Sequence, residues 1–160
     1  MNVEIIDFKQ TDIAVLEHRG APSMLMHSVQ KFISWRKKHH LPPSKSRTFG
    51  LIYDDPSSVS AEEFRFDVCA ELFKNLDVSN DKSELTTHIK QKTIPAGKCA
   101  RIKYFGSTDD IEKVVLYLYD QWLPKSGENL RDFPVYFQYI KMMPQVGEFE
   151  QETDVFLPLI

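Results

Sequence analysis

Cysteine is scarce in this sequence, and long apolar runs and a positive net charge are absent. The two cysteines, Cys69 and Cys99, match no zinc spacing, so we expect both to be small, buried, reduced residues. No apolar run approaches the roughly 20 residues of a membrane span, and the N-terminus lacks the pattern of a signal peptide. The missing signal peptide favours a cytoplasmic location. With a net charge of −3, we expect no direct binding to membranes or nucleic acid.

Motifs for metal binding and covalent catalysis are also missing. His39 and His40 are adjacent without a third ligand at a suitable spacing, so we expect no metal. Ser126-Gly127 lacks the preceding glycine of a nucleophile elbow, so a serine hydrolase is rejected. No catalytic residue and no cofactor are predicted. With 42% hydrophobic and 27% charged residues over a length of 160, the chain has the composition of one globular domain.

An internal similarity divides the chain into halves. IAVLEHRG ends at Gly20 and CARIKYFG ends at Gly106, and both alternate apolar and polar residues before the glycine. This alternation predicts a half-buried strand that leads into a turn. We place repeat 1 at about residues 1–72 and repeat 2 at about residues 94–160, within a single domain that spans residues 1–160.

A helix is expected after each glycine. The second copy has apolar residues at one-face helical spacing, and Pro124 and Gly127 are expected to end it. The first copy ends before Pro42-Pro43 with a basic run, residues 36–40, that is typical of a solvated helix terminus. The stripes comprise Leu25, Val29, Phe32 and Ile33 in the first helix, and Ile111, Val114, Val115, Leu118, Tyr119 and Trp122 in the second.

Two further strands follow each helix, at residues 48–56 and 64–72 and at residues 133–144 and 153–159. The order β-α-β-β therefore occurs twice, and short connections favour antiparallel pairing. We predict an α+β fold in which a tandem β-α-β-β repeat forms an antiparallel sheet with two helices on one face. A cleft at the pseudo-twofold junction is the expected ligand site.

The linker between the repeats, about residues 73–93, is rich in polar residues and shows little periodicity, which predicts a long connection. It includes DVSNDKSE (residues 77–84), which lacks the glycine and the final glutamate of a calcium loop.

Six segments together resemble the GyrI-like small-molecule-binding family, which includes DNA gyrase inhibitors of the SbmC type and effector-binding domains of multidrug-responsive transcription activators. They are FGLIYDDP (49–56), AEEFRFDVC (61–69), IPAGKCARIKYFG (94–106), QWLPKSG (121–127), FPVYFQY (133–139) and TDVFLPL (153–159). The resemblance implies a pocket for bulky aromatic or cationic compounds, in a stand-alone form without a DNA-binding module.

The sequence departs from the family at Phe137. Members of the family often have a glutamate at the position that Phe137 occupies in FPVYFQY. A buried carboxylate can attract a cation or act as a general acid or base, whereas phenylalanine offers only apolar area and a π face. The related hydrolases of strained cyclopropane-containing toxins use that glutamate, so its loss argues against hydrolysis here.

Aromatic residues on the expected strands are the candidate ligand contacts. Strand alternation puts Phe137 and Tyr139 on one strand face. The repeat matches these two residues with Leu51 and Tyr53. Ordinary core packing is the alternative for all of them, and for Arg65 and Asp67 we expect an exposed cross-strand ion pair. The candidate ligand-binding residues are Leu51, Tyr53, Phe66, Trp122, Phe137 and Tyr139.

The function that these features favour is a binding protein for hydrophobic or aromatic compounds, similar to gyrase-inhibitor and toxin-resistance proteins. Inhibition of DNA gyrase through a protein contact is the first alternative. Hydrolysis of strained toxins is the second. The sequence does not identify the ligand or the oligomeric state.

Overall fold

The computed structural model describes residues 1–73 and 87–160, which divide into two compact units. The α1 unit comprises Thr11–Ile94, and the α3 unit combines Met1–Gln10 with Pro95–Ile160. The first ten residues therefore belong with the second half of the chain, unlike the boundaries expected from the repeat. The calcium-like segment at residues 77–84 lies outside the described residues.

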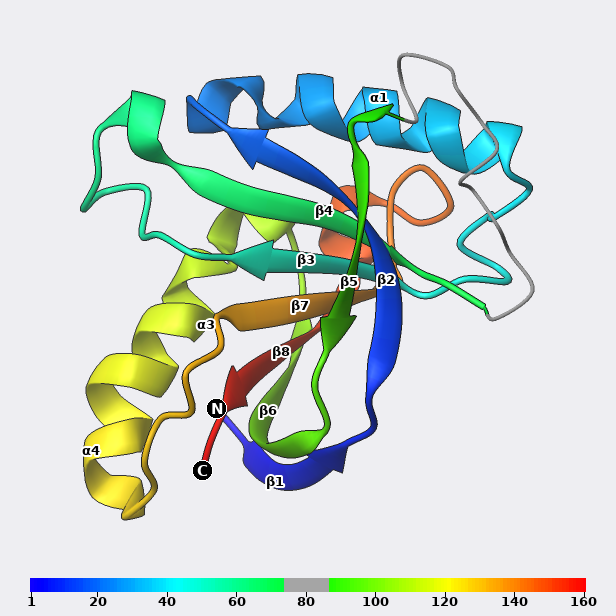
Figure 1. Ribbon diagram of the computed structural model, residues 1–160. Helices are drawn as coiled ribbons and strands as arrows, with labels where there is room; N and C mark the ends of the chain where they lie inside the picture. Colours follow the sequence, from blue (N-terminus) through cyan, green and yellow to red (C-terminus); the bar gives the residue numbers. More distant parts are fainter. Residues whose placement is uncertain (74–86) are drawn as a thin grey trace. The chain divides into compact units, whose positions relative to one another are not determined.

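The α1 unit contains a four-stranded antiparallel sheet and one long helix (Figure 1). The strand order is β3-β4-β2-β5, and the helix α1 packs against β2 and β4. Gly20 turns the chain after β2 with a positive φ of 142°, as expected for the glycine that ends this motif. The elements are β2 (Thr11–Arg19), α1 (Leu25–Lys38), β3 (Thr48–Ile52), β4 (Arg65–Glu71) and β5 (Ile89–Ile94), with short 3₁₀ turns at Pro22–Met24 and Ala61–Glu63.

The α3 unit also combines a helical segment with its own four-stranded antiparallel sheet. In chain order two strands precede this helical segment, whereas one strand precedes the helix of the α1 unit. The strand order is β1-β6-β8-β7, and Gly106 has a φ of 145°, close to that of Gly20. The strands are β1 (Val3–Phe8), β6 (Gly97–Phe105), β7 (Val135–Lys141) and β8 (Glu152–Pro158). Its helical segment consists of α3 (Glu112–Tyr117), the π-helical turn η4 (Leu118–Trp122) and α4 (Leu123–Ser126), with 3₁₀ turns at Thr108–Asp110 and Glu148–Glu150.

The predicted α+β class with antiparallel pairing is confirmed, but each unit has one strand more than predicted. The additional strands are β1 and β5, and they share the same pattern of exposed and buried positions. The expectation of an irregular connection is therefore wrong for Ile89–Ile94. Each of the two strands has only one buried residue among six, so the apolar alternation that marks a half-buried strand is weak in them.

Aromatic side chains form the core of each unit. In the α1 unit, Phe32 and Trp35 of the helix are buried, and their ring centroids are 5.6 Å apart in a stacked arrangement. In the α3 unit, Tyr136 stacks on Phe156 at 4.8 Å and meets Phe8 edge-on at 5.1 Å. Such pairs add about 0.5–1.5 kcal/mol each beyond the area they bury.

The second predicted helix continues past Pro124, so the expectation that this proline ends it is wrong. Pro124 lies in the first turn of α4, where a missing N–H costs little. The preceding π-helical turn changes the hydrogen-bond pattern just before the proline. Gly127, with a φ of 75°, ends the helix instead.

Arg36 corrects the expectation of a fully solvated basic run at the end of α1. Its side chain is buried, and it donates from Nε to the carbonyl of Leu41, from one terminal nitrogen to Thr48 Oγ1 and from the other to the carbonyl of Ser46. Burial lowers the pKa of the guanidinium to about 10. Arg36 therefore ties the chain after the helix to β3, while Lys37 and Lys38 stay exposed.

We predict that Arg36→Ala lowers the free energy of unfolding by about 2–4 kcal/mol, because it leaves two buried carbonyls and a hydroxyl without their donor. Lys37→Ala, at an exposed neighbour, should change it by less than about 0.5 kcal/mol. Urea unfolding of the two variants is the measurement. Equal losses would show that the three hydrogen bonds of Arg36 do not stabilise the loop.

Both cysteines are free and buried, as predicted, and burial raises the pKa of each thiol. Within residues 1–73 and 87–160, none of the helices has the length and apolarity needed to cross a bilayer.

Candidate functional site

The six predicted ligand contacts are divided between the two units. The α1 unit holds Leu51, Tyr53 and Phe66, and the α3 unit holds Trp122, Phe137 and Tyr139. Leu51, Phe66 and Phe137 are buried, whereas Tyr53, Trp122 and Tyr139 are half-buried. The role of these residues in binding stays a prediction.

Strand register separates Phe66 from Tyr53. Phe66 pairs with His18, whose ring contacts Ser28 of α1, so Phe66 lies on the helix-covered face of the sheet. Asp67, the next residue, lies on the opposite face, and there its carboxylate accepts a hydrogen bond from the Tyr53 hydroxyl. Of the α1-unit candidates, Tyr53 is therefore the one that faces away from the helix with a partly exposed ring.

The matching of Phe137 and Tyr139 with Leu51 and Tyr53 is wrong by one residue. Leu51 pairs with Asp67 in the α1 unit, and Gln138 pairs with Asp154 in the α3 unit. Asp67 and Asp154 hold the same third position of β4 and β8, so Leu51 corresponds to Gln138. A shift of one residue moves a side chain to the other face of a sheet.

Trp122 lines a small pocket on the helical segment of the α3 unit. The pocket has a volume of about 180 Å³ and is bounded also by Tyr117, Gln121, Lys125 and Ser126. It adjoins the π-helical turn, a distortion that is frequent at functional sites.

The most developed constellation in the described chain surrounds a carboxylate that the sequence did not single out as a site. The Asp67 side chain is fully buried. Its Oδ2 accepts from Tyr53 Oη at 2.6 Å and from Lys92 Nζ at 2.8 Å, and its Oδ1 accepts from the Arg19 guanidinium at 3.0 Å. The expected exposed pair between Arg65 and Asp67 is therefore wrong, because Arg65 instead pairs with Asp54 at 2.9 Å.

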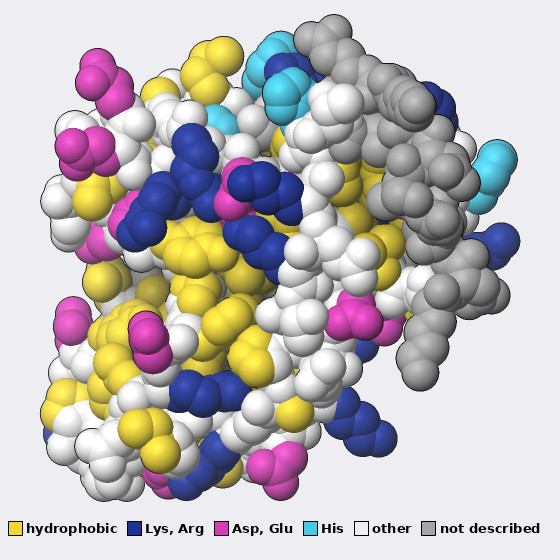
Figure 2. Space-filling view, in the orientation of Figure 1, with side chains coloured by type: hydrophobic (Ala, Val, Ile, Leu, Met, Phe, Trp, Pro, Cys, Tyr) yellow, Lys and Arg dark blue, Asp and Glu magenta, His cyan; other side chains and the backbone are white. Residues whose placement is uncertain are grey.

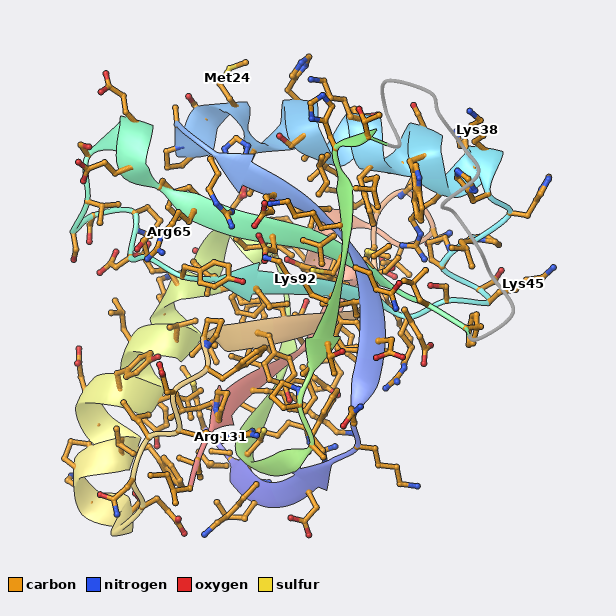
Figure 3. All side chains as sticks on the ribbon, viewed as in Figure 1. Met24, Lys38, Lys45, Arg65, Lys92 and Arg131 are labelled. Atoms are coloured by element: carbon orange, nitrogen blue, oxygen red, sulfur yellow. The ribbon has the colours of Figure 1, made fainter. Side chains whose placement is uncertain are left out.

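Three cationic groups surround the Tyr53 ring. The Arg19 and Arg65 guanidinium carbons are each 5.4 Å from the ring centroid, and Lys92 Nζ is 5.7 Å from it. Arg65 is the first residue of β4, and Lys92 lies on β5. Figure 3 labels both side chains in the region of β3 and β4. The eight residues Glu17, Arg19, Tyr53, Asp54, Arg65, Asp67, Lys90 and Lys92 are called the Tyr53 cluster below.

The pKa shifts of Tyr53 and Lys92 favour the protonated form of both groups. Burial, together with the hydrogen bond to Asp67, raises the pKa of Tyr53 to about 12, so the phenol stays a donor at neutral pH. Burial lowers the pKa of Lys92, but the hydrogen bonds to Asp67 and Glu17 outweigh this effect and raise it above its usual value. The cluster is therefore suited to donating hydrogen bonds, and Tyr53 is not a base.

Glu17 links two lysines on the neighbouring strand. Its carboxylate accepts from Lys90 at 2.6 Å and from Lys92 at 2.9 Å. The hydrogen bonds from Lys90 and then Lys92 lower the pKa of Glu17 from 4.5 to about 2. These contacts connect β2 to β5.

Because the pKa of Glu17 is lower in the folded chain, its contribution to stability is present above pH 4.5 and is lost as the pH falls toward about 2. Glu17→Gln should therefore reduce the free energy of unfolding at pH 6 and have little effect near pH 2. Urea unfolding across this range measures the difference. When Lys90→Met is already present, Glu17→Gln should lower the free energy of unfolding at pH 6 by less than it does in the parent protein. An unchanged effect would contradict the assigned pairing.

The equivalent aspartate of the α3 unit is not satisfied in the same way. Asp154 is buried, and its Oδ1 makes no hydrogen bond within the described residues. Burial raises the pKa of this carboxyl, although Arg101 and Lys103 oppose the shift. Asp67-Val68 and Asp154-Val155 recur at the same place in the last predicted strand of each repeat, and this recurrence is the sequence signal that could have identified both aspartates.

Within the part of the chain that the structure describes, no group of three or more His, Cys, Asp or Glu side chains is placed to hold a metal ion. The chemistry of the Tyr53 cluster is that of hydrogen bonding and charge.

Comparison with known proteins gives the family. The GyrI-like small molecule binding domain matches residues 1–160. The probable transcriptional regulator YgiV of Escherichia coli K12 is 38% identical, over 99% of this chain and 96% of its own length. A DNA gyrase inhibitor of Erwinia billingiae is 24% identical over 95% and 94%. The chain therefore belongs to the GyrI-like small-molecule-binding domain family.

Solved structures agree with the fold. The EcmrR C-terminal domain superposes with a TM-score of 0.74 at 16% identity, covering 99% of this chain and 97% of that domain. The SAV2435 protein, in a complex with tetraphenylphosphonium, superposes with a TM-score of 0.58 at 10% identity, covering 100% of this chain and 94% of that protein. At these identities the likeness concerns the fold.

Proposed function

We propose that this chain is a cytoplasmic binding protein for aromatic small molecules, and that Tyr53 contacts the ligand. The observation that carries the proposal is the half-buried Tyr53 ring, held in one orientation by its hydrogen bond to the buried Asp67. A fixed ring offers apolar area at little cost in conformational entropy, and a partly exposed one is accessible to a ligand. Family membership and a ligand-bound neighbour of the same fold support small-molecule binding.

Sequestration of the bound compound is the simplest biological role for such a protein. A toxin held by the chain would be withdrawn from its target, in keeping with the toxin-resistance role expected from the family resemblance. Hydrolysis receives less support, because Phe137 supplies no carboxylate and the oxygen atoms of Asp67 are engaged by three donors.

The proposal is tested by thermal shift with neutral aromatics, aromatic acids and lipophilic cations. A ligand at about 100 times its Kd should stabilise the fold by about 2.7 kcal/mol. Tyr53→Ala should weaken its binding by roughly 1 kcal/mol or more, and Tyr119→Ala, at an exposed tyrosine of the α3 unit, should not. A ligand that binds Tyr53→Ala as tightly as the parent would show that the site lies elsewhere.

Inhibition of DNA gyrase is the second candidate function, favoured by the gyrase inhibitor among the relatives. A supercoiling assay with purified gyrase tests it. Inhibition by the protein at micromolar concentration would support this function, and unchanged supercoiling in a large excess of protein would exclude it.

A further inference from the structure

The charges of the Tyr53 cluster are layered. Its carboxylates lie deep: the exposed side-chain fractions are 0% for Asp67, 11% for Asp54 and 23% for Glu17. Its cations lie outside: the fractions are 30% for Lys92, 38% for Arg19, 52% for Arg65 and 62% for Lys90. A molecule that approaches this surface meets positive groups first, although the protein as a whole is negative.

Apolar surface lies directly beside these cations. Figure 2 shows Lys and Arg side chains beside a hydrophobic patch in the region of β3 and β4. The Tyr53 ring is within cation–π distance of Arg19, Arg65 and Lys92. A cationic ligand placed against this ring would therefore lie close to three positive charges, and it would be repelled.

The guanidinium groups of Arg65 and Arg19 can attract an anion, and Arg65 can also donate a hydrogen bond to it. Arg65 donates from Nε and one terminal nitrogen to Asp54, and its other terminal nitrogen makes no hydrogen bond to the described residues. Arg19 donates from its two terminal nitrogens to Asp67, Glu17 and the His18 carbonyl. Its contribution to anion binding is therefore its positive charge. Hydrogen bonds between guanidinium and carboxylate groups are about twice as strong as neutral ones.

We propose that the Tyr53 cluster binds aromatic anions, typified by aryl carboxylates. The ligand ring lies against Tyr53, and its acid group lies against Arg65, Arg19 and Lys92. This inference rests on the proposed function and gives the chemical class of its ligand. It also predicts that the chain rejects lipophilic cations of the tetraphenylphosphonium type at this surface.

The test compares three naphthalene compounds by calorimetric titration at neutral pH: the carboxylate, the neutral carboxamide and the methylammonium. The carboxylate should bind about tenfold more tightly than the carboxamide, and the methylammonium should be the weakest. The preference for the carboxylate should shrink at about 0.3 M salt, because these cations are partly exposed.

Arg65→Gln should weaken the carboxylate about fivefold and leave the carboxamide within about twofold. Arg47→Gln is the matched control, because Arg47 pairs with Glu71 at 2.9 Å and lies 5.2 Å from the Phe49 ring, a similar arrangement outside the cluster. Lys90→Gln, at the most exposed cation of the cluster, should reduce carboxylate binding about twofold without endangering the fold.

Equal affinity for the carboxylate and the carboxamide would overturn the inference. If Tyr53→Ala weakened both compounds equally, the proposed small-molecule site would still stand. Tighter binding of the methylammonium, an equal loss in Arg47→Gln, or no binding of any of the three compounds would also overturn it. In the last case, the thermal-shift panel still decides the proposed function separately.

Discussion

Replacement of Asp67 by alanine is expected to lower the free energy of unfolding by about 3–5 kcal/mol. The side chain is fully buried and accepts hydrogen bonds from Tyr53, Lys92 and Arg19. Its removal leaves two cations and a phenol without the acceptor that offsets the cost of their partial burial. Breaking a buried ion pair from one side costs far more than the pair contributes as a whole.

Two comparisons isolate the cause of that loss. Asp110→Asn removes an exposed pair with Lys113, in which more than half of each side chain is exposed, and should cost less than about 1 kcal/mol. Adding Lys92→Met to Asp67→Ala should recover part of the stability, because the unpaired ammonium is gone. Denaturant unfolding of the four proteins supplies the data. A loss below about 1 kcal/mol in Asp67→Ala would contradict the assignment of Asp67 as the centre of the cluster.

Phe137→Glu is expected to be comparably severe at neutral pH, and its effect should depend on pH. Phe137 is 2% exposed, and its ring centroid lies 6.2 Å from that of Tyr139. Loss of a buried phenylalanine costs about 3–5 kcal/mol by itself. Burial should also raise the pKa of the introduced carboxyl above its usual value of about 4.3.

The sign of the pH effect follows from that pKa. When the folded-state pKa of a carboxyl is raised, the unfolded chain ionises first as the pH increases. The stability of Phe137→Glu should therefore fall from pH 4 toward neutrality. Phe137→Gln introduces a side chain of nearly the same shape as glutamate but without a charge. Its stability should not show the added decrease with pH. Unfolding of both variants at several pH values decides the point, and parallel curves would mean that water reaches position 137.

The same variant also tests the predicted role of Phe137 in ligand binding. If this side chain lines a ligand site of the α3 unit, tetraphenylphosphonium should restore part of the lost stability to Phe137→Glu at neutral pH, because its charge offsets the carboxylate. It should not stabilise Phe137→Gln. The same cation effect in both variants would remove Phe137 from the list of contacts.

The parts of the fold that the sequence predicts well are those with a strong local pattern. Apolar alternation before Gly20 and Gly106 located β2 and β6, and one-face periodicity located both helices. The strands β1 and β5 are not predicted, because each has only one buried residue among six and so lacks that alternation. Pro124 was read as a stop, although a π-helical turn precedes it and the proline falls in a first turn.

The candidate site was only partly predictable, because its chemistry depends on contacts between distant strands. Tyr53 was identified as an aromatic on a predicted strand. The sequence predicts an exposed Asp67, because alternation places it on the face opposite Phe66. Sequence alone does not show that Tyr53 and Lys92 cover that face. Lys92 lies 25 residues from Asp67 in sequence, on the strand that was missed. Register likewise decides that Leu51 corresponds to Gln138 and not to Phe137.

The central claim, that an aromatic ligand contacts Tyr53, is tested most directly by NMR of the protein with labelled tyrosine rings. The Tyr53 ring resonance is assigned by its absence in Tyr53→Phe, and the protein is titrated with naphthalene carboxylate. The account predicts intermolecular contacts between the ligand protons and the Tyr53 ring, with no such contacts to Tyr104 of the α3 unit. Saturable binding that leaves the Tyr53 ring unperturbed, with contacts confined to other tyrosines, would contradict it.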